Sequence, residues 1–258
     1  MSGEPEPRKN PRLAALLSLA SEAFAKDDVA AALHFTSEAV ELDASDWTAQ
    51  VALGHALSRN GQHEAASAAC SKAVELNMSH YATWLALGVV GARAKLFQQA
   101  EKSMKSALEL AHPGHAKAEV LTALGTLYSD SERVTEVEAC FVQAINEGPQ
   151  NIEPRAKLFM HLVAQRQLEK AASVGDALDE LVKQRTAPLS QLERTQTTEV
   201  LALRDDIRRD LKKLAEYRAS EPGRSQMMGI RFEAWASNWA VGRGILTACS
   251  FILRPFQR

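Results

Sequence analysis

The first half of this 258-residue sequence repeats itself with a period of 34 residues. Three sets of residues coincide when the chain is shifted by this period: Ala39, Ala73 and Ala107; Leu19, Leu53 and Leu87; and Ala32, Ala66 and Ala100. A fixed period of this length is typical of stacked similar repeats, whereas a globule with one central core shows no such period. Because stacked repeats present long continuous surfaces, we expect the function to reside on a groove and not in a catalytic pocket.

Each repeat contains two amphipathic segments separated by a break. Between residues 81 and 114, Trp84, Leu87 and Gly88 have the spacing W-x2-L-G on a first predicted helix, and a break follows near Lys95. The second predicted helix carries residues at spacings of four and three: Ala100, Met104 and Ala107. Such spacings place side chains on one face of a helix. The small residues allow the two helices to approach closely, and the large ones fill the space between them.

The composition supports a helical chain and does not point to a nucleic-acid partner or a cofactor. Only 13 glycines and 9 prolines occur in 258 residues, and these are the two residue types that destabilise helices most. The net charge of -2 gives no strongly basic surface, so nucleic acid is not an expected partner. The three cysteines, Cys70, Cys140 and Cys249, are far apart and odd in number. They indicate neither a disulfide framework nor a metal site, and we expect a reducing compartment and no cofactor.

The repeats resemble the tetratricopeptide repeat family, whose pattern is W-x2-L-G-x2-Y, then A-x3-F, then P. Leu121, Leu124, Gly125, Tyr128 and Pro149 give the most complete match to this pattern. The resemblance implies an all-α fold, namely a right-handed α-solenoid of helix-turn-helix repeats that ends in a capping helix.

The resemblance covers five repeats, at residues 13–46, 47–80, 81–117, 118–151 and 152–185. The fifth repeat departs most from the pattern, because Phe159 stands at the glycine position and Gly175 at the aromatic position. Residues 1–12 are polar and proline-rich, and we expect a disordered lead without targeting function. Residues 186–220 are predicted to form the cap, with an apolar stripe at Val200, Leu203, Ile207, Leu211 and Leu214.

In this family the first helix of each repeat lines the concave face, so the register of the repeats assigns the groove. The residues assigned to a partner-binding groove are Val51, His55, Arg59, Leu85, Val89, Arg93, Thr122, Thr126 and Met160. Such a groove is mostly apolar, with two arginines near its rim, and suits an amphipathic helix or an extended apolar peptide. The alternative is that Val51, Leu85 and Val89 only complete the packing between helices.

One group within the family can be set aside. Some of its members are co-chaperones that clamp the C-terminal carboxylate of the heat-shock proteins Hsp70 and Hsp90 with lysine, arginine and asparagine. The matching positions in one frame are Leu17, Ser21, Ala52, Ala82 and Ala86, and a frame shifted by one repeat also has none of these three residue types. A carboxylate requires cationic donors, so the heat-shock protein C-terminal peptide is not an expected partner.

The tail, residues 221–258, differs from the rest of the chain. Its stretch 234–253 contains a single charge, Arg243, and Phe232, Trp235 and Trp239 lie on one side of a predicted helix. A transmembrane helix, an interfacial helix at lipid headgroups, a segment docked on protein and a disordered end are all open interpretations. Insertion in a membrane would bury Arg243 at a cost of roughly 2.5–3.5 kcal/mol. In the docked interpretation, the tail lies across the chain's own groove and competes with a partner.

The sequence therefore predicts a non-catalytic scaffold or adaptor that binds another protein in the concave groove. No catalytic residues are proposed, because no nucleophile, acid–base pair or phosphate-binding glycine loop stands out. The alternative function is a peripheral or tail-anchored membrane adaptor that uses residues 221–258 as its anchor. The expected location is the cytoplasm, with the nucleus and a membrane surface as alternatives.

Overall fold

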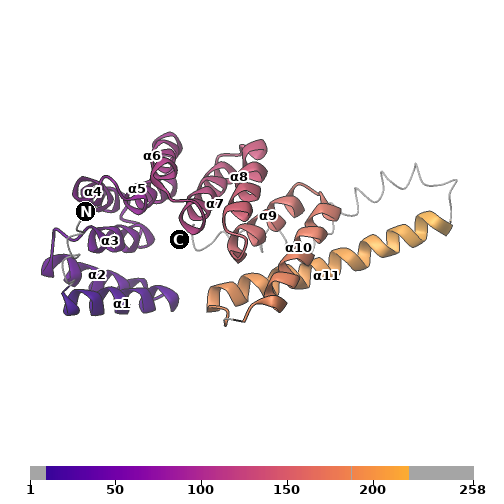
Figure 1. The fold of residues 1–258 in the computed structure, drawn as a ribbon, viewed down its shortest axis with the longest axis horizontal. Coiled ribbons are helices and arrows are strands. Elements are labelled where there is room, and N and C mark those ends of the chain that lie inside the picture. Colours follow the sequence, from indigo (N-terminus) through magenta and orange to yellow (C-terminus); the bar gives the residue numbers. More distant parts are fainter. Residues whose placement is uncertain (1–9, 187, 221–258) are drawn as a thin grey trace, which may run out of the picture. The chain divides into compact units, whose positions relative to one another are not determined.

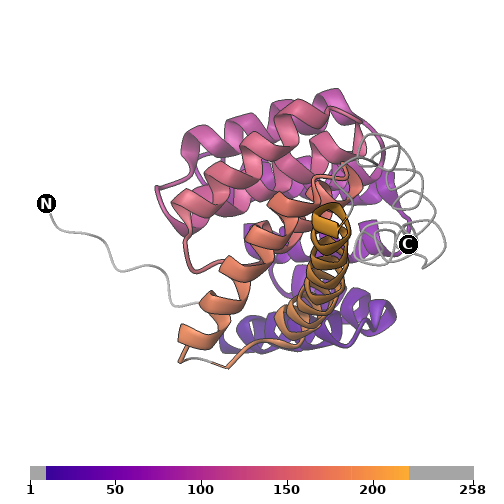
Figure 2. The ribbon, with the colours of Figure 1, turned by 90° about the vertical axis from the view of Figure 1, so that its right-hand side faces the viewer.

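A computed structural model describes residues 10–186 and 188–220, which form eleven α-helices and no strand (Figure 1). A second view, turned by 90°, likewise draws every described element as a helix (Figure 2). The helices are α1 (Pro11–Ala25), α2 (Val29–Leu42), α3 (Trp47–Arg59), α4 (His63–Leu76), α5 (Tyr81–Arg93), α6 (Phe97–Leu110), α7 (His115–Asp130), α8 (Val134–Glu147), α9 (Ile152–Ala164), α10 (Leu168–Gln184) and α11 (Gln191–Ser220). The all-α solenoid expected from the sequence is confirmed.

The chain divides between Arg133 and Val134 into two compact parts, called unit 1 and unit 2 below. Unit 1 holds α1 to α7, and unit 2 holds α8 to α11. Within unit 1 each helix contacts the next one, and the first helices α1, α3, α5 and α7 also contact each other in series. This is the contact pattern of stacked helix pairs, in which no pair buries its apolar stripe alone. Residues 1–9 and the tail 221–258, including Phe232, Trp235 and Trp239, lie outside the described residues.

Aspartates begin two helices of unit 1, α2 and α3. An Oδ1 atom of Asp28 accepts a hydrogen bond from the amide of Ala31 at 2.9 Å, and Asp46 accepts one from Ala49 at the same distance. Both are N-cap bonds, which satisfy amides that have no partner within the helix. Repeated caps of this kind help to fix where the helices start.

The two helices of a repeat are joined by tight turns that contain one residue with positive φ. These residues are Asp27 (φ 59°), Gly61 (80°), Lys95 (61°), Glu132 (59°) and Arg166 (59°). They follow the period of the repeats, and Lys95 coincides with the break expected from the sequence. Only glycine adopts this left-handed conformation without steric cost. Of the five turn residues, Gly61 is therefore the one that adopts the positive φ without backbone strain.

Replacing Lys95 or Arg166 by glycine is expected to stabilise the protein by about 0.5–1 kcal/mol per site. The strain of a side chain at positive φ is removed, and the larger entropy of the unfolded glycine chain offsets only part of that gain. Urea unfolding followed by circular dichroism measures the change. Lys102→Gly, at an exposed position in the interior of α6, is the control and should destabilise by about 1 kcal/mol. Destabilisation by Lys95→Gly as large as that of the control would contradict this account.

Glycines on the first helices allow close helix contacts in unit 1. A Cβ atom added at Gly54 would lie 2.3 Å from Sγ of Cys70, and one added at Gly88 would lie 2.5 Å from Cγ of Met104. In both pairs the two residues are 16 positions apart, and the second pair stands one repeat after the first. The missing side chain on the first helix therefore makes room for a side chain from the second helix.

The fifth repeat, in unit 2, reverses this arrangement of large and small residues. Phe159 has no exposed surface on α9, whereas Gly175, 16 residues later on α10, is the small member. A Cβ atom at Gly175 would meet the stem of Arg204 from α11, with Cγ at 2.9 Å. The departure of this repeat from the family pattern thus coincides with the place where the capping helix packs.

Helix α11 caps unit 2, as the sequence predicts. It contacts both α9 and α10, and it buries Val200 and Ile207 with 0% and 2% of their surfaces exposed. Leu203 and Leu211 are half-buried. The opposite side of the helix exposes polar residues such as Glu199 and Lys212. An apolar inner side and a polar outer side are what the end of a helical stack requires.

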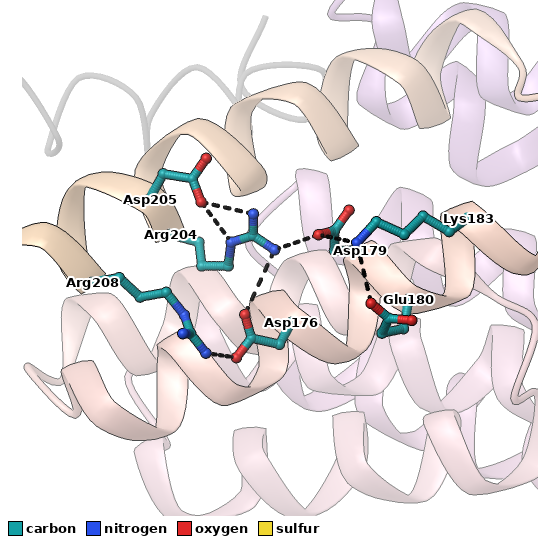
Figure 3. Close-up of polar contacts among 7 residues, drawn as sticks. All are labelled: Asp176, Asp179, Glu180, Lys183, Arg204, Asp205 and Arg208. Carbon is teal, nitrogen blue, oxygen red and sulfur yellow. Dashed lines mark hydrogen bonds and ion pairs between the residues drawn. The ribbon is translucent and has the colours of Figure 1, made fainter.

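Ion pairs hold α11 against α10 (Figure 3). Nη1 of Arg204 lies 2.9 Å from Oδ2 of Asp179 and 3.6 Å from Oδ1 of Asp176, and Arg208 also pairs with Asp176. Within α11, Nη2 of Arg204 lies 2.7 Å from Oδ1 of Asp205. Hydrogen bonds from Arg204 and then from Lys183 hold the pKa of Asp179 below its usual value. Arg204 and Arg208 of α11 are therefore ion-paired within the chain.

Candidate binding face on unit 1

The residues that the sequence assigns to the groove fall into three rows across the first helices. The rows of unit 1 are Val51, Leu85 and Thr122; His55, Val89 and Thr126; and Arg59 and Arg93. We call these eight residues the candidate face. They come from α3, α5 and α7, and α5 contacts both of the others. Met160 belongs to α9 of unit 2 and is 9% exposed, so it is described separately from this face.

The first row contributes mainly to packing. Leu85 and Thr122 are only 7% and 5% exposed, and Val51 packs against the cluster formed by Ala66, Cys70, Ala86 and Val90. The packing alternative raised for Val51 and Leu85 therefore has direct support. The second row is different, because His55, Val89 and Thr126 all remain partly exposed.

The threonine hydroxyls of the face are bonded within α7. Oγ1 of Thr122 donates to the carbonyl of Ala118 at 2.7 Å, and Oγ1 of Thr126 donates to that of Thr122 at 2.9 Å. Because each hydroxyl proton is directed to the helix backbone, the methyl groups and the acceptor lone pairs are what these side chains can offer a ligand.

Arg59 joins α3 to the preceding repeat. Its Nη1 atom donates to the carbonyl of Phe24 at 3.4 Å, and its guanidinium lies 5.4 Å from the centre of the Phe24 ring. The guanidinium also pairs with the carboxylate of Asp27. Arg59 therefore has a structural role at the turn between α1 and α2, in addition to its predicted place on the rim of the groove.

Arg59 and Arg93, the third row, make the electrostatic potential around His55 positive. Burial, followed by the charges of Arg93 and Arg59, lowers the pKa of His55 to about 4. Burial, followed by the charge of Arg59, lowers the pKa of Arg93 to about 10. His55 is therefore neutral at pH 7, whereas Arg93 is charged.

The lowered pKa of His55 makes stability depend on pH. The unfolded chain binds a proton at His55 near the ordinary pKa of 6.5, but the folded chain does so only near 4. This contribution to stability is complete above pH 6.5 and is lost progressively as the pH falls from 6.5 to 4. We expect wild type to lose about 2 kcal/mol more than His55→Gln between pH 7 and pH 5, in urea unfolding at each pH.

His34→Gln is the matched control, because His34 is exposed on α2 of the same unit. This variant should keep the pH dependence of the wild type. Equal pH dependence in His55→Gln and wild type would show that His55 is not held neutral by the fold.

Two features of the face were not found from the sequence. Asp27 was not assigned to the groove, although it pairs with Arg59 of the face. Asp130 takes the place of Arg59 and Arg93 in the fourth repeat, because the third repeat, residues 81–117, is three residues longer than the others. Both Asp27 and Asp130 are charged residues at turns, and a comparison of the turn residues of successive repeats reveals them in the sequence.

Comparison with known proteins supports the register of the repeats. Residues 48–80 match the model of the tetratricopeptide repeat, which coincides with the second predicted repeat and with helices α3 and α4 of unit 1. This part of the chain is a tetratricopeptide repeat. No curated protein sequence matches it.

Solved tetratricopeptide repeat structures share its fold. The Thermus thermophilus protein TTC0263 has a TM-score of 0.60 at 18% identity, over 74% of this chain and 99% of that one. Yeast Tom70 has a TM-score of 0.61 at 14% identity, over 83% of this chain and 43% of Tom70. The Pseudomonas aeruginosa protein PilF has a TM-score of 0.54 at 13% identity, over 86% and 97% of the two chains. At these identities the likeness concerns the fold alone.

The described helices offer no membrane span. None of the helices within residues 10–186 and 188–220 has the length and hydropathy needed to cross a bilayer. The segment for which membrane contact was considered, residues 221–258, lies outside the described residues.

Proposed function

We propose that this protein is a non-catalytic scaffold whose candidate face binds a helix or an apolar peptide segment of a partner protein. The observation that carries the proposal is the second row, where His55, Val89 and Thr126 stay partly exposed on three consecutive first helices. A row at one repeat spacing can contact successive anchor residues of a bound segment. Because His55 is neutral at pH 7, this row carries no charge.

Affinity capture from cells that express the protein tests this proposal. The variant Val89→Arg/Thr126→Arg places two bulky charges in the second row, and Gln98→Arg/Gln99→Arg places the same charges on exposed positions of α6. We expect quantitative mass spectrometry to show at least a tenfold loss of captured partner for the first variant and no loss for the second. Circular dichroism verifies that both variants fold. Equal capture by both variants would refute binding at the candidate face.

A second comparison addresses the tail. Capture by residues 1–220 and by the full chain shows whether residues 221–258 compete with the partner, contribute to its binding or do neither. Stronger capture by the shorter chain supports competition, and equal capture argues against it. The membrane adaptor function depends on the same residues and is not supported by any described helix.

A further inference from the structure

The second helices of the first three repeats end in the same pair of residues, a glutamate followed by a leucine. The pairs recur every 34 residues, and they are Glu41 with Leu42 on α2, Glu75 with Leu76 on α4, and Glu109 with Leu110 on α6. The three leucines are 36%, 40% and 37% exposed, and the three glutamates are exposed as well. We call these six residues the acidic edge. Since the exposure recurs in every pair, the edge is a regular feature of unit 1.

The acidic edge runs along one side of unit 1. Its residues occupy equivalent positions in consecutive repeats, and each helix from α2 to α6 contacts the next one. Packed helices have axes about 8–10 Å apart, so the pairs on α2 and α6 are separated by no more than about 40 Å. Met78, two residues after the middle pair, adds a side chain that is 65% exposed. A single segment of chain can therefore contact all three pairs.

The negative charge of this edge is not balanced by the residues around it. The C-terminus of a helix carries a partial negative charge and favours basic side chains, yet α2, α4 and α6 have no basic residue in their last turns. Glu101, earlier on α6, pairs with Lys105. In the part of the chain that the structure describes, the side chains of Glu41, Glu75 and Glu109 form no ion pair or hydrogen bond. Three carboxylates and three helix ends thus place negative charge beside exposed leucines.

We propose that the tail, residues 221–258, docks on the acidic edge, with arginines beside the glutamates and apolar side chains on the leucines. The tail contains five arginines and only two glutamates, so its charge is opposite to that of the edge. Three of these arginines, Arg231, Arg243 and Arg254, are distributed along its apolar stretch 234–253. Arginine–carboxylate pairs fix the position of a docked segment, and the apolar contacts between them add burial.

The length of the tail and the charge of the candidate face both agree with this place. The tail has 38 residues, which span up to roughly 125 Å when extended and therefore exceed the length of the edge. Arg59 and Arg93 make the potential at the candidate face positive, and a positive surface repels a basic segment. Docking on the acidic edge goes beyond partner binding at the candidate face and does not depend on it.

A spin label on the tail of the full chain tests this contact. The label is attached to Cys249 in a chain that also carries Cys140→Ser. Cys70 has no exposed surface, and burial raises the pKa of its thiol to about 12, so this thiol does not react. Methyl NMR then measures the paramagnetic broadening of the three leucines of the edge. Leu96, which is 48% exposed at the other end of α6, is the reference.

Two triple variants separate the charge of the edge from the total charge of the protein. The edge variant is Glu41→Gln/Glu75→Gln/Glu109→Gln. The control variant removes three exposed glutamates of unit 1 near the turns within repeats: Glu22→Gln/Glu64→Gln/Glu132→Gln. Circular dichroism verifies that both variants fold.

We expect the label to broaden the leucines of the edge more than Leu96. The edge variant should reduce this broadening at least threefold, because the tail loses its carboxylate partners, and the control variant should leave it unchanged. Equal broadening in the two variants would overturn the proposal. Broadening strongest at Val89 and Thr126 would place the tail on the candidate face, and unaffected edge leucines would leave the edge to a basic segment of another protein; either result would also overturn it.

Discussion

Replacing Phe159 by alanine is expected to destabilise the protein by about 3–5 kcal/mol. Phe159 is the largest side chain without exposed surface in unit 2, and it occupies the position at which the other repeats carry a small residue. Its removal leaves a cavity on α9, which is enclosed by helices α8, α10 and α11 of the same unit. Neighbouring side chains relax only partly into such a space, so both hydrophobic burial and packing contacts are lost. Urea unfolding monitored at 222 nm gives the change in free energy.

Leu192→Ala provides the control, because Leu192 is 58% exposed on α11. It should change stability by no more than about 0.5 kcal/mol, as exposed substitutions usually do. If Phe159→Ala cost as little as Leu192→Ala, the reversed arrangement of large and small residues in the fifth repeat would not be what supports unit 2.

Replacing Gly88 by leucine is expected to cost about 1–3 kcal/mol through overpacking. The new Cβ atom would lie 2.5 Å from Cγ of Met104 and 3.2 Å from the carbonyl oxygen of Ala100. Met104 is 2% exposed, so its side chain has little room to move away. Met104→Ala alone should also destabilise, by about 2–5 kcal/mol, because it leaves a cavity in unit 1.

The combination of the two substitutions separates this contact from general damage. The double variant Gly88→Leu/Met104→Ala should be more stable than the sum of the single effects by at least about 1 kcal/mol, because leucine fills the space that methionine leaves. Gly88→Leu/Met78→Ala is the control, since Met78 is 65% exposed and should give no rescue. Additive effects in both double variants would show that the side chains at positions 88 and 104 do not compete for the same space.

The helix pairs and their register were predictable because the 34-residue period appears directly in the sequence. The repeat predicted at 47–80 agrees with the matched residues 48–80. The cap was predictable from an apolar stripe, and Val200 and Ile207 are indeed buried. In each of these cases, spacing along the chain determines which side of a helix is apolar, so local pattern was sufficient.

The interactions that the sequence did not reveal depend on neighbours from other helices. The stem of Arg204 fills the space at Gly175, although a charged residue does not signal a packing role in a sequence. The predicted rim residue Arg59 is tied to Phe24 and Asp27, which belong to the preceding repeat. Likewise, the pKa of His55 falls because of burial and of an arginine on the next first helix. Each of these facts requires the distance between helices, which periodicity alone does not provide.

The most direct test of partner binding at the candidate face is methyl NMR of the full chain with a partner obtained by affinity capture. Val89 lies in the second row of the face, whereas Leu96 and Leu110 are 48% and 37% exposed at the two ends of α6 in the same unit. We predict that the partner shifts or broadens the methyl resonances of Val89 and Thr126 and leaves those of Leu96 and Leu110 unchanged. Changes at Leu96 and Leu110 with unchanged Val89 and Thr126 resonances would place the partner on another surface and contradict the account.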